Sequence, residues 1–102
     1  MKNIGVLGCT GSIGTTTLRV IRDNNYRVGL LANYSDYDGL LRLIEEFHPK
    51  YAVCIQKKYL YFDGKEYSLP DDFLSRPATY DGLDLVVNGI VGIAGLNPTL
   101  AI

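Results

Sequence analysis

Short apolar runs alternate with segments of helical periodicity along the first half of the chain. The runs Asn3–Leu7 and 28–32 have the length and content of buried parallel strands. Between them, the segment Ser12–Asn24 predicts an amphipathic helix with its charged residues largely on the outer face. The residues at helical spacing on the opposite face are Ile13, Thr17, Val20 and Ile21. A strand, a glycine turn and a helix are therefore expected in immediate succession.

The same alternation continues through the second half. A second apolar helix is expected to end before His48, followed by a strand at 51–55. An Asp63-Gly64 pair between aromatic runs predicts a small hairpin over 57–67, and a further strand is expected at 83–87. The apolar positions that predict this second helix are Leu40, Leu41, Leu43, Ile44 and Phe47.

Two shorter helical segments are expected near the carboxyl end. Asp71 can cap a short turn of helix through Phe73, which Pro77 should interrupt. Asn97 is positioned as the cap of another helix, with a proline at its first position. Repeated strand-helix units with short connections imply parallel strands joined by right-handed crossovers.

Three glycines stand between the first strand and the first helix. A bound phosphate needs backbone N–H donors at a helix start and room to approach them. On this interpretation Gly8 permits the turn, Gly11 lets a pyrophosphate approach the backbone, and Gly14 lets the helix pack closely. The hydroxyl groups of Thr10 and Ser12 would add donors. The alternative is a glycine-rich turn with a purely structural role.

This loop predicts the fold class as well as the ligand. The chain is expected to be an α/β protein with a Rossmann-like, doubly wound parallel sheet in strand order 3-2-1-4. The hairpin is not counted in that order. The ligand crevice should lie between strands 1 and 4 at their carboxyl ends.

The residues after the second strand bear on the choice of cofactor. NAD-specific domains place an acidic residue at the end of this strand, whereas here Asn33 and Tyr34 are neutral. Ser35 with Asp38 could form a capping box that aims a helix start at a 2'-phosphate. NADP is therefore favoured, although no arginine or lysine stands there and Asp36 places a carboxylate nearby.

The composition and net charge of the chain limit the kinds of partner that it is expected to bind. A chain of 102 residues with a formal charge of −1 suits one domain and has no positive excess with which to hold nucleic acid or an anionic membrane. Cys9 and Cys54 lack the spacing of a zinc site or a disulfide framework, which favours free thiols in a cytoplasmic protein. Reactivity at Cys9 and catalysis by His48 are the less favoured interpretations of those residues.

The chain resembles the N-terminal part of the 1-deoxy-D-xylulose 5-phosphate reductoisomerase family. The resemblance rests on Ile4-Gly5-Val6-Leu7-Gly8-Cys9-Thr10-Gly11-Ser12-Ile13-Gly14, on Phe47-His48-Pro49-Lys50-Tyr51-Ala52-Val53, and most specifically on Ile90-Val91-Gly92-Ile93-Ala94-Gly95-Leu96-Asn97-Pro98-Thr99-Leu100. It implies an enzyme that rearranges and reduces 1-deoxy-D-xylulose 5-phosphate to 2-C-methyl-D-erythritol 4-phosphate in isoprenoid precursor synthesis. It also implies NADPH, a divalent metal (magnesium or manganese) and a homodimer.

The resemblance assigns site residues by position. It implies that the cofactor pyrophosphate and its sugars contact Thr10, Gly11, Ser12 and Ile13. Tyr34, Ser35 and Asp36 would surround the adenosine phosphate, and Gly89 with Ile90 would lie near the nicotinamide. The family often has a basic residue and an amide where this chain has Tyr34 and Ser35, which weakens the expected preference for NADPH.

The family's catalytic and metal-binding residues follow the segment that this chain matches. Residues 1–102 are therefore interpreted as an incomplete N-terminal dinucleotide-binding domain, without catalytic or metal-binding residues and inactive alone. Two alternatives stay open. One is a different NAD(P)-dependent dehydrogenase, such as an aldehyde or homoserine type, and the other is a stand-alone nucleotide-binding module.

Overall fold

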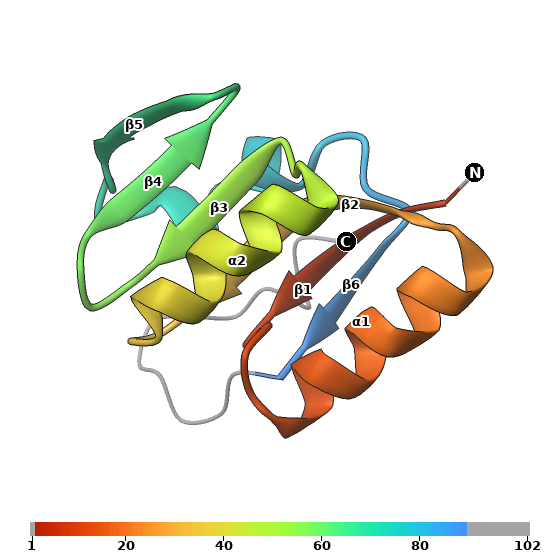
Figure 1. Cartoon of the computed structure of the whole chain (residues 1–102). Coiled ribbons are helices and arrows are strands. Elements are labelled where there is room, and N and C mark those ends of the chain that lie inside the picture. Colours follow the sequence, from red (N-terminus) through yellow and green to blue (C-terminus); the bar gives the residue numbers. More distant parts are fainter. Residues whose placement is uncertain (1, 90–102) are drawn as a thin grey trace.

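The computed structural model describes residues 2–89, which form one six-stranded sheet with helices on both of its faces (Figure 1). The strand order is β5-β4-β3-β2-β1-β6. The strands are β1 (Asn3–Leu7), β2 (Arg27–Asn33), β3 (Tyr51–Cys54), β4 (Tyr59–Phe62), β5 (Lys65–Ser68) and β6 (Leu85–Asn88). The expected helix at Asn97 and the expected site residue Ile90 lie outside the described residues.

Four strands of the sheet pair in parallel, and the other two join it through antiparallel pairing. β1 pairs in parallel with β2 and β6, and β2 pairs in parallel with β3, so these four strands stand in the expected order. The expected four-stranded sheet was nevertheless incomplete. The hairpin of β4 and β5 continues the same sheet, because β4 turns back and pairs antiparallel with β3. Asp63 and Gly64 form its turn with φ of 50° and 80°, a left-handed pair that matches the twist of the strands.

The two α-helices cover one face of the sheet. α1 (Ser12–Asn24) and α2 (Tyr37–Phe47) lie side by side on it in Figure 1. Buried residues of both helices pack there against β1, β2 and β3, and the shared cluster includes Val6, Leu18, Ile21, Leu31, Leu40, Ile44 and Ala52. The expected helix bounds are confirmed for α1.

Two short 3-10 helices cover the opposite face. η1 (Phe73–Ser75) and η2 (Pro77–Tyr80) place apolar side chains against β1, β2 and β3. This second cluster includes Leu7, Leu30, Val53, Leu60, Phe73, Leu74, Tyr80 and Val86. The expected cap at Asp71 was wrong, because Asp72 precedes η1 and its side chain makes no capping bond. Hydroxyl groups hold the segment instead, since Thr79 donates to Phe73 O at 2.6 Å.

The inward face of α1 also differs from the sequence-based expectation. Gly14, Leu18 and Ile21 are its buried residues, whereas the Ile13 and Val20 side chains are 53% and 50% exposed. The helix is rotated because it approaches the glycine loop most closely at Gly14, where no side chain fits. The side chain of Ile13 is therefore exposed beside the loop and does not contribute to the core.

A bulge sets the phase of β2. Its pairing with β1 runs from Ile4 opposite Val28 directly to Gly5 opposite Leu30, so that Gly29 is an extra residue. A side chain at Gly29 would meet Leu83 and Asn3, the nearest atom lying 2.6 Å from its Cβ. After the bulge, Leu30 and Ala32 face η1 and η2. Because side chains alternate along a strand, the side chain of Asn33, the last residue of β2, points toward the face that α1 and α2 cover.

Candidate functional site

The loop between β1 and α1 is fastened to the end of β2. The backbone N–H groups of Gly8 and Cys9 both donate to Ala32 O, at 2.6 and 3.0 Å, and Gly11 N donates to Gly8 O at 3.0 Å. Gly8 has a φ of 80°, so the tight turn expected at this position requires a glycine. The loop is therefore a fixed platform at the carboxyl edge of the parallel strands.

The start of α1 has no side-chain cap. Gly11 is the N-cap residue, and the first turn contains no acidic residue. The first helical bond runs from Thr15 N to Gly11 O at 2.9 Å, which leaves the N–H groups of residues 12–14 without partners in the helix. Unpaired donors and the positive end of the helix dipole together favour an anion at this point.

The three loop glycines differ in the space around them. A Cβ at Gly14 would lie 2.1 Å from Gly8 O and 2.6 Å from Cys9 Cα, so the close packing expected there is present. A Cβ at Gly11 would have only Gly8 O within 4 Å, at 3.5 Å, and would otherwise point into open space. Gly89, the last described residue, lies against the same loop, because its Cβ would stand 3.1 Å from Leu7 O and 3.3 Å from Ile13 Cβ.

The start of α2 was predicted with the wrong cap. The carboxylate of Asp36, not the hydroxyl of Ser35, accepts the Gly39 N–H at 2.9 Å. Ser35 O instead accepts the N–H of Tyr37 at 2.9 Å, which closes a turn one residue ahead of the helix. A Cβ at Gly39 would lie 2.4 Å from Asp36 Oδ2, so this glycine makes room for the carboxylate. The expected Ser35 and Asp38 capping box is therefore absent.

Asn33 joins the two helix starts and was missed as a site residue. Its side-chain Nδ2 donates to Thr10 Oγ1 at 3.2 Å and to Asp36 O at 2.6 Å, and the residue is 2% exposed. Its Oδ1 atom is buried and has no hydrogen-bond partner among residues 2–89. An asparagine that ends an apolar strand is the signal in the sequence, because a buried amide needs partners.

Tyr34 and Ser35 form the exposed part of the turn after β2. The side chain of Tyr34 is 51% exposed. Its backbone is held, because Tyr34 O accepts Gln56 N–H at 2.7 Å. The turn therefore has a fixed backbone and an exposed aromatic ring. Thr10, Gly11, Ser12, Ile13, Tyr34, Ser35, Asp36 and Gly89 all lie along the carboxyl edge of the parallel strands.

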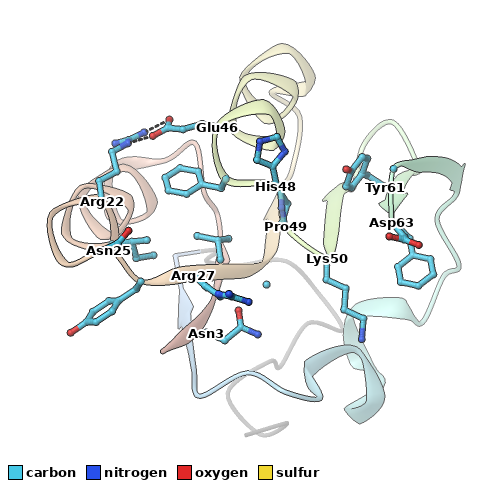
Figure 2. A pocket seen from close by; sticks show the side chains of 17 residues that line it. Asn3, Arg22, Asn25, Arg27, Glu46, His48, Pro49, Lys50, Tyr61 and Asp63 are labelled. Carbon is cyan, nitrogen blue, oxygen red and sulfur yellow. Dashed lines mark hydrogen bonds and ion pairs between the residues drawn. The ribbon is translucent and has the colours of Figure 1, made fainter. Parts of the chain in front are cut away.

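A large cavity lies at the opposite edge of the sheet. It has a volume of about 980 Å³, and Figure 2 shows Arg27, His48 and Lys50 around it. These basic residues lie near the carboxyl ends of α1 and α2, where the helix dipole favours positive charge. His48 is the C-cap of α2 in a left-handed conformation, and its N–H donates to Ile44 O. The cavity is remote from the glycine loop. The helix dipoles explain why basic residues lie around it.

Cys9 is buried beneath the glycine loop as a neutral thiol. Burial raises the pKa of this thiol to about 12, from an ordinary value of 9.0, and the Asp36 carboxylate adds to the effect. Cys54 is also free and buried. A buried thiol with a raised pKa is a poor nucleophile, which supports a packing role for Cys9.

We expect both thiols to react far more slowly with Ellman's reagent at pH 8 in the folded chain than in the unfolded chain. The neutral form of Cys9 is favoured by folding, and this contribution to stability is complete below pH 9. It should be lost progressively as the pH rises from 9 toward 12. Absorbance of the coloured thiolate released from the reagent follows the reaction. Immediate reaction of one thiol in the native chain would contradict the assignment.

Residues 2–89 contain no group of three or more His, Cys, Asp or Glu side chains placed to hold a metal ion. Within the same part of the chain, no helix has the length and apolar content needed to cross a membrane.

Comparison with known proteins gives a consistent family. The model of the 1-deoxy-D-xylulose 5-phosphate reductoisomerase family matches residues 4–102. The chain is 37% identical over 112 residues to the protein of that name from Clostridium tetani, with 98% of the chain and 29% of the relative covered. It is 39% identical over 104 residues to that from Francisella tularensis, with 96% and 27% covered. The chain thus spans less than a third of the length of these relatives.

Proposed function

Since the chain belongs to the 1-deoxy-D-xylulose 5-phosphate reductoisomerase family, we propose that its glycine loop and the start of α1 bind the pyrophosphate of NADPH. The observation that carries the proposal is the uncapped helix start at Gly11. The N–H groups of residues 12–14 have no helical partners, and no acidic side chain in the first turn competes for them. This donor set fits a pyrophosphate.

The surrounding residues suit the other parts of a dinucleotide. The loop backbone at Thr10, Gly11, Ser12 and Ile13 would hold the pyrophosphate and its sugars, with Gly8 and Gly14 shaping the loop. The exposed ring of Tyr34 can stack on adenine, with Ser35 and Asp36 beside the ribose. Gly89 lies against the loop at the end of β6, where a Rossmann-like crevice between β1 and β6 would place the nicotinamide half. Ile90 is assigned there only by resemblance.

The cofactor would supply a hydride, and these residues would bind and orient it. We assign the reaction itself to the longer protein that the relatives represent. That protein would rearrange and reduce 1-deoxy-D-xylulose 5-phosphate to 2-C-methyl-D-erythritol 4-phosphate, as a cytoplasmic homodimer with a divalent metal. The family membership supports this assignment, and catalytic and metal-binding residues would come from outside the part of the chain described here.

A carboxylate at position 12 tests the pyrophosphate site. Ser12 is exposed at the first position of α1, so Ser12→Asp should stabilise the helix by about 0.3–1 kcal/mol through its dipole. The same charge should weaken NADPH binding about tenfold or more, because it repels the pyrophosphate and occupies the free donors. Isothermal calorimetry gives the affinity and urea unfolding gives the stability.

The matched control is Ser12→Ala, which removes the hydroxyl group without adding charge. It should lower the affinity by far less than the aspartate. Opposite signs for stability and affinity in Ser12→Asp distinguish a ligand effect from damage to the fold. Unchanged NADPH affinity in the aspartate variant would reject the assignment of this helix start.

A further inference from the structure

A groove between α1 and α2 opens beside the glycine loop. Its volume is about 240 Å³. Apolar residues and Gly39 form part of its lining, and the polar side chains that line it are Thr10, Thr15, Arg22, Asp36 and Arg42. Thr10 belongs to the phosphate loop and Asp36 begins α2, so the groove meets the candidate cofactor site at its mouth.

Most of the polar groups in this groove are already engaged. Arg22 forms an ion pair with Glu46, whose shorter bond joins Arg22 Nε to Glu46 Oε2 and whose second bond is 2.8 Å long. The Thr15 hydroxyl donates to Ser12 O at 3.1 Å. The Asp36 carboxylate caps α2.

Two groups remain available for a ligand. Arg42 makes no hydrogen bond or ion pair with any residue from 2 to 89, although it lies on the same wall as Asp36. The Thr10 oxygen accepts a hydrogen bond from Asn33 Nδ2, which leaves its own proton free to be donated elsewhere. The groove therefore offers one unpaired guanidinium group and one directed hydroxyl donor.

Arg42 and Thr10 both line this groove. Side chains on a helix tilt toward its N-terminus, which favours an Arg42 side chain directed toward the start of α2. The capping bond to Gly39 holds the Asp36 carboxylate over the first turn of α2. An anion at the groove mouth would therefore meet the Arg42 guanidinium group, with the Asp36 carboxylate held at the start of α2.

We propose that Arg42 and the Thr10 hydroxyl bind the 2'-phosphate of NADPH, and that they give the chain its preference over NADH. The proposal rests on the proposed function, because it places this phosphate beside the bound pyrophosphate. A phosphate monoester carries nearly two negative charges near neutral pH, and a guanidinium group can bind it through two parallel hydrogen bonds. Arg42 thus supplies the positive charge that Tyr34 and Ser35 lack.

The test compares two cofactors in one variant. Calorimetric titration of the chain with NADPH and with NADH gives the preference, and the same titrations follow for Arg42→Gln. The substitution should weaken NADPH binding about tenfold or more and change NADH binding by less than about twofold, since only NADPH has the phosphate. Arg19→Gln is the matched control, because Arg19 is exposed on α1 and does not line the groove.

The outcomes separate this inference from the function on which it rests. Selective loss of NADPH affinity in Arg42→Gln, with Arg19→Gln unchanged, supports the inference. Equal losses for both cofactors, or a preference that survives in Arg42→Gln, overturn it while leaving the dinucleotide site intact. Binding of neither cofactor by the unaltered chain overturns both proposals. Circular dichroism of each variant shows that the helices are retained.

Discussion

Alanine at Gly14 is expected to destabilise the folded chain by about 3 kcal/mol or more, because its Cβ overlaps backbone atoms that cannot move independently. That Cβ would lie 2.1 Å from Gly8 O and 2.6 Å from Cys9 Cα. Moving α1 away would open the core around Leu18 and Ile21, and moving the loop would break its bonds to Ala32 O. Urea unfolding followed by circular dichroism measures the loss.

Gly11→Ala provides the matched comparison. Its Cβ has only Gly8 O nearby, at 3.5 Å, and Gly11 has an extended backbone that alanine can adopt. The loss of stability should stay within about 1 kcal/mol, the usual cost of a poorer N-cap residue. Cofactor binding should nevertheless weaken, because the methyl group enters the space proposed for the pyrophosphate. Similar stabilities for the two variants would show that the loop tolerates the overlap at Gly14.

Leu30→Ala should destabilise the chain by about 2–5 kcal/mol, the usual range for a buried leucine truncated to alanine. Leu30 is 0% exposed and belongs to the cluster that packs η1 and η2 against the sheet. The cavity cannot collapse easily, because strands lie on both sides of β2 and the 3-10 helices are held by hydrogen bonds from Thr79 and Tyr80. Chemical denaturation gives the free energy of unfolding directly.

Leu85→Ala is the control for that measurement. Leu85 lies in β6 and is 48% exposed, so its truncation removes less buried surface and should cost under about 1 kcal/mol. If both variants lost the same stability, Leu30 would not hold the central position that the structure gives it. Each variant keeps the glycine loop unchanged, so a shared loss of cofactor binding would reflect unfolding.

The periodicity of apolar residues and the turn residues predicted most of the fold. β1 and α1 have the expected bounds, and the Asp63-Gly64 hairpin is confirmed. The rotation of α1 was wrong because Ile13 and Gly14 are adjacent, and hydrophobicity alone favoured the isoleucine as the buried residue. Close contact between Gly14 and the loop decides the rotation, and that contact depends on where β1 and β2 place the loop.

The parts of the candidate site that depend on neighbouring residues could be predicted from the sequence. The parts that depend on contacts between distant residues could not. The glycine loop could be predicted from its spacing together with its position between a buried strand and an amphipathic helix. The cap of α2 could not, since Asn33 holds the carbonyl group of Asp36 and Gly39 makes room for its carboxylate. The role that we propose for Arg42 has no local signal in the sequence either, because this residue lies in α2, well beyond the turn after β2.

The extra residue in β2 has a consequence for how this sequence can diverge. Gly29 shifts the phase of the strand, so that Ala32 O meets the glycine loop while Asn33 reaches Thr10 and Asp36. A one-residue insertion or deletion after the bulge would exchange the two faces for every residue that follows in the strand. Insertions and deletions should therefore be selected against between the bulge and the end of β2, and should accumulate in the surface turns. The positions of alignment gaps among homologues would then show where the alternation of side chains in this strand is under selection.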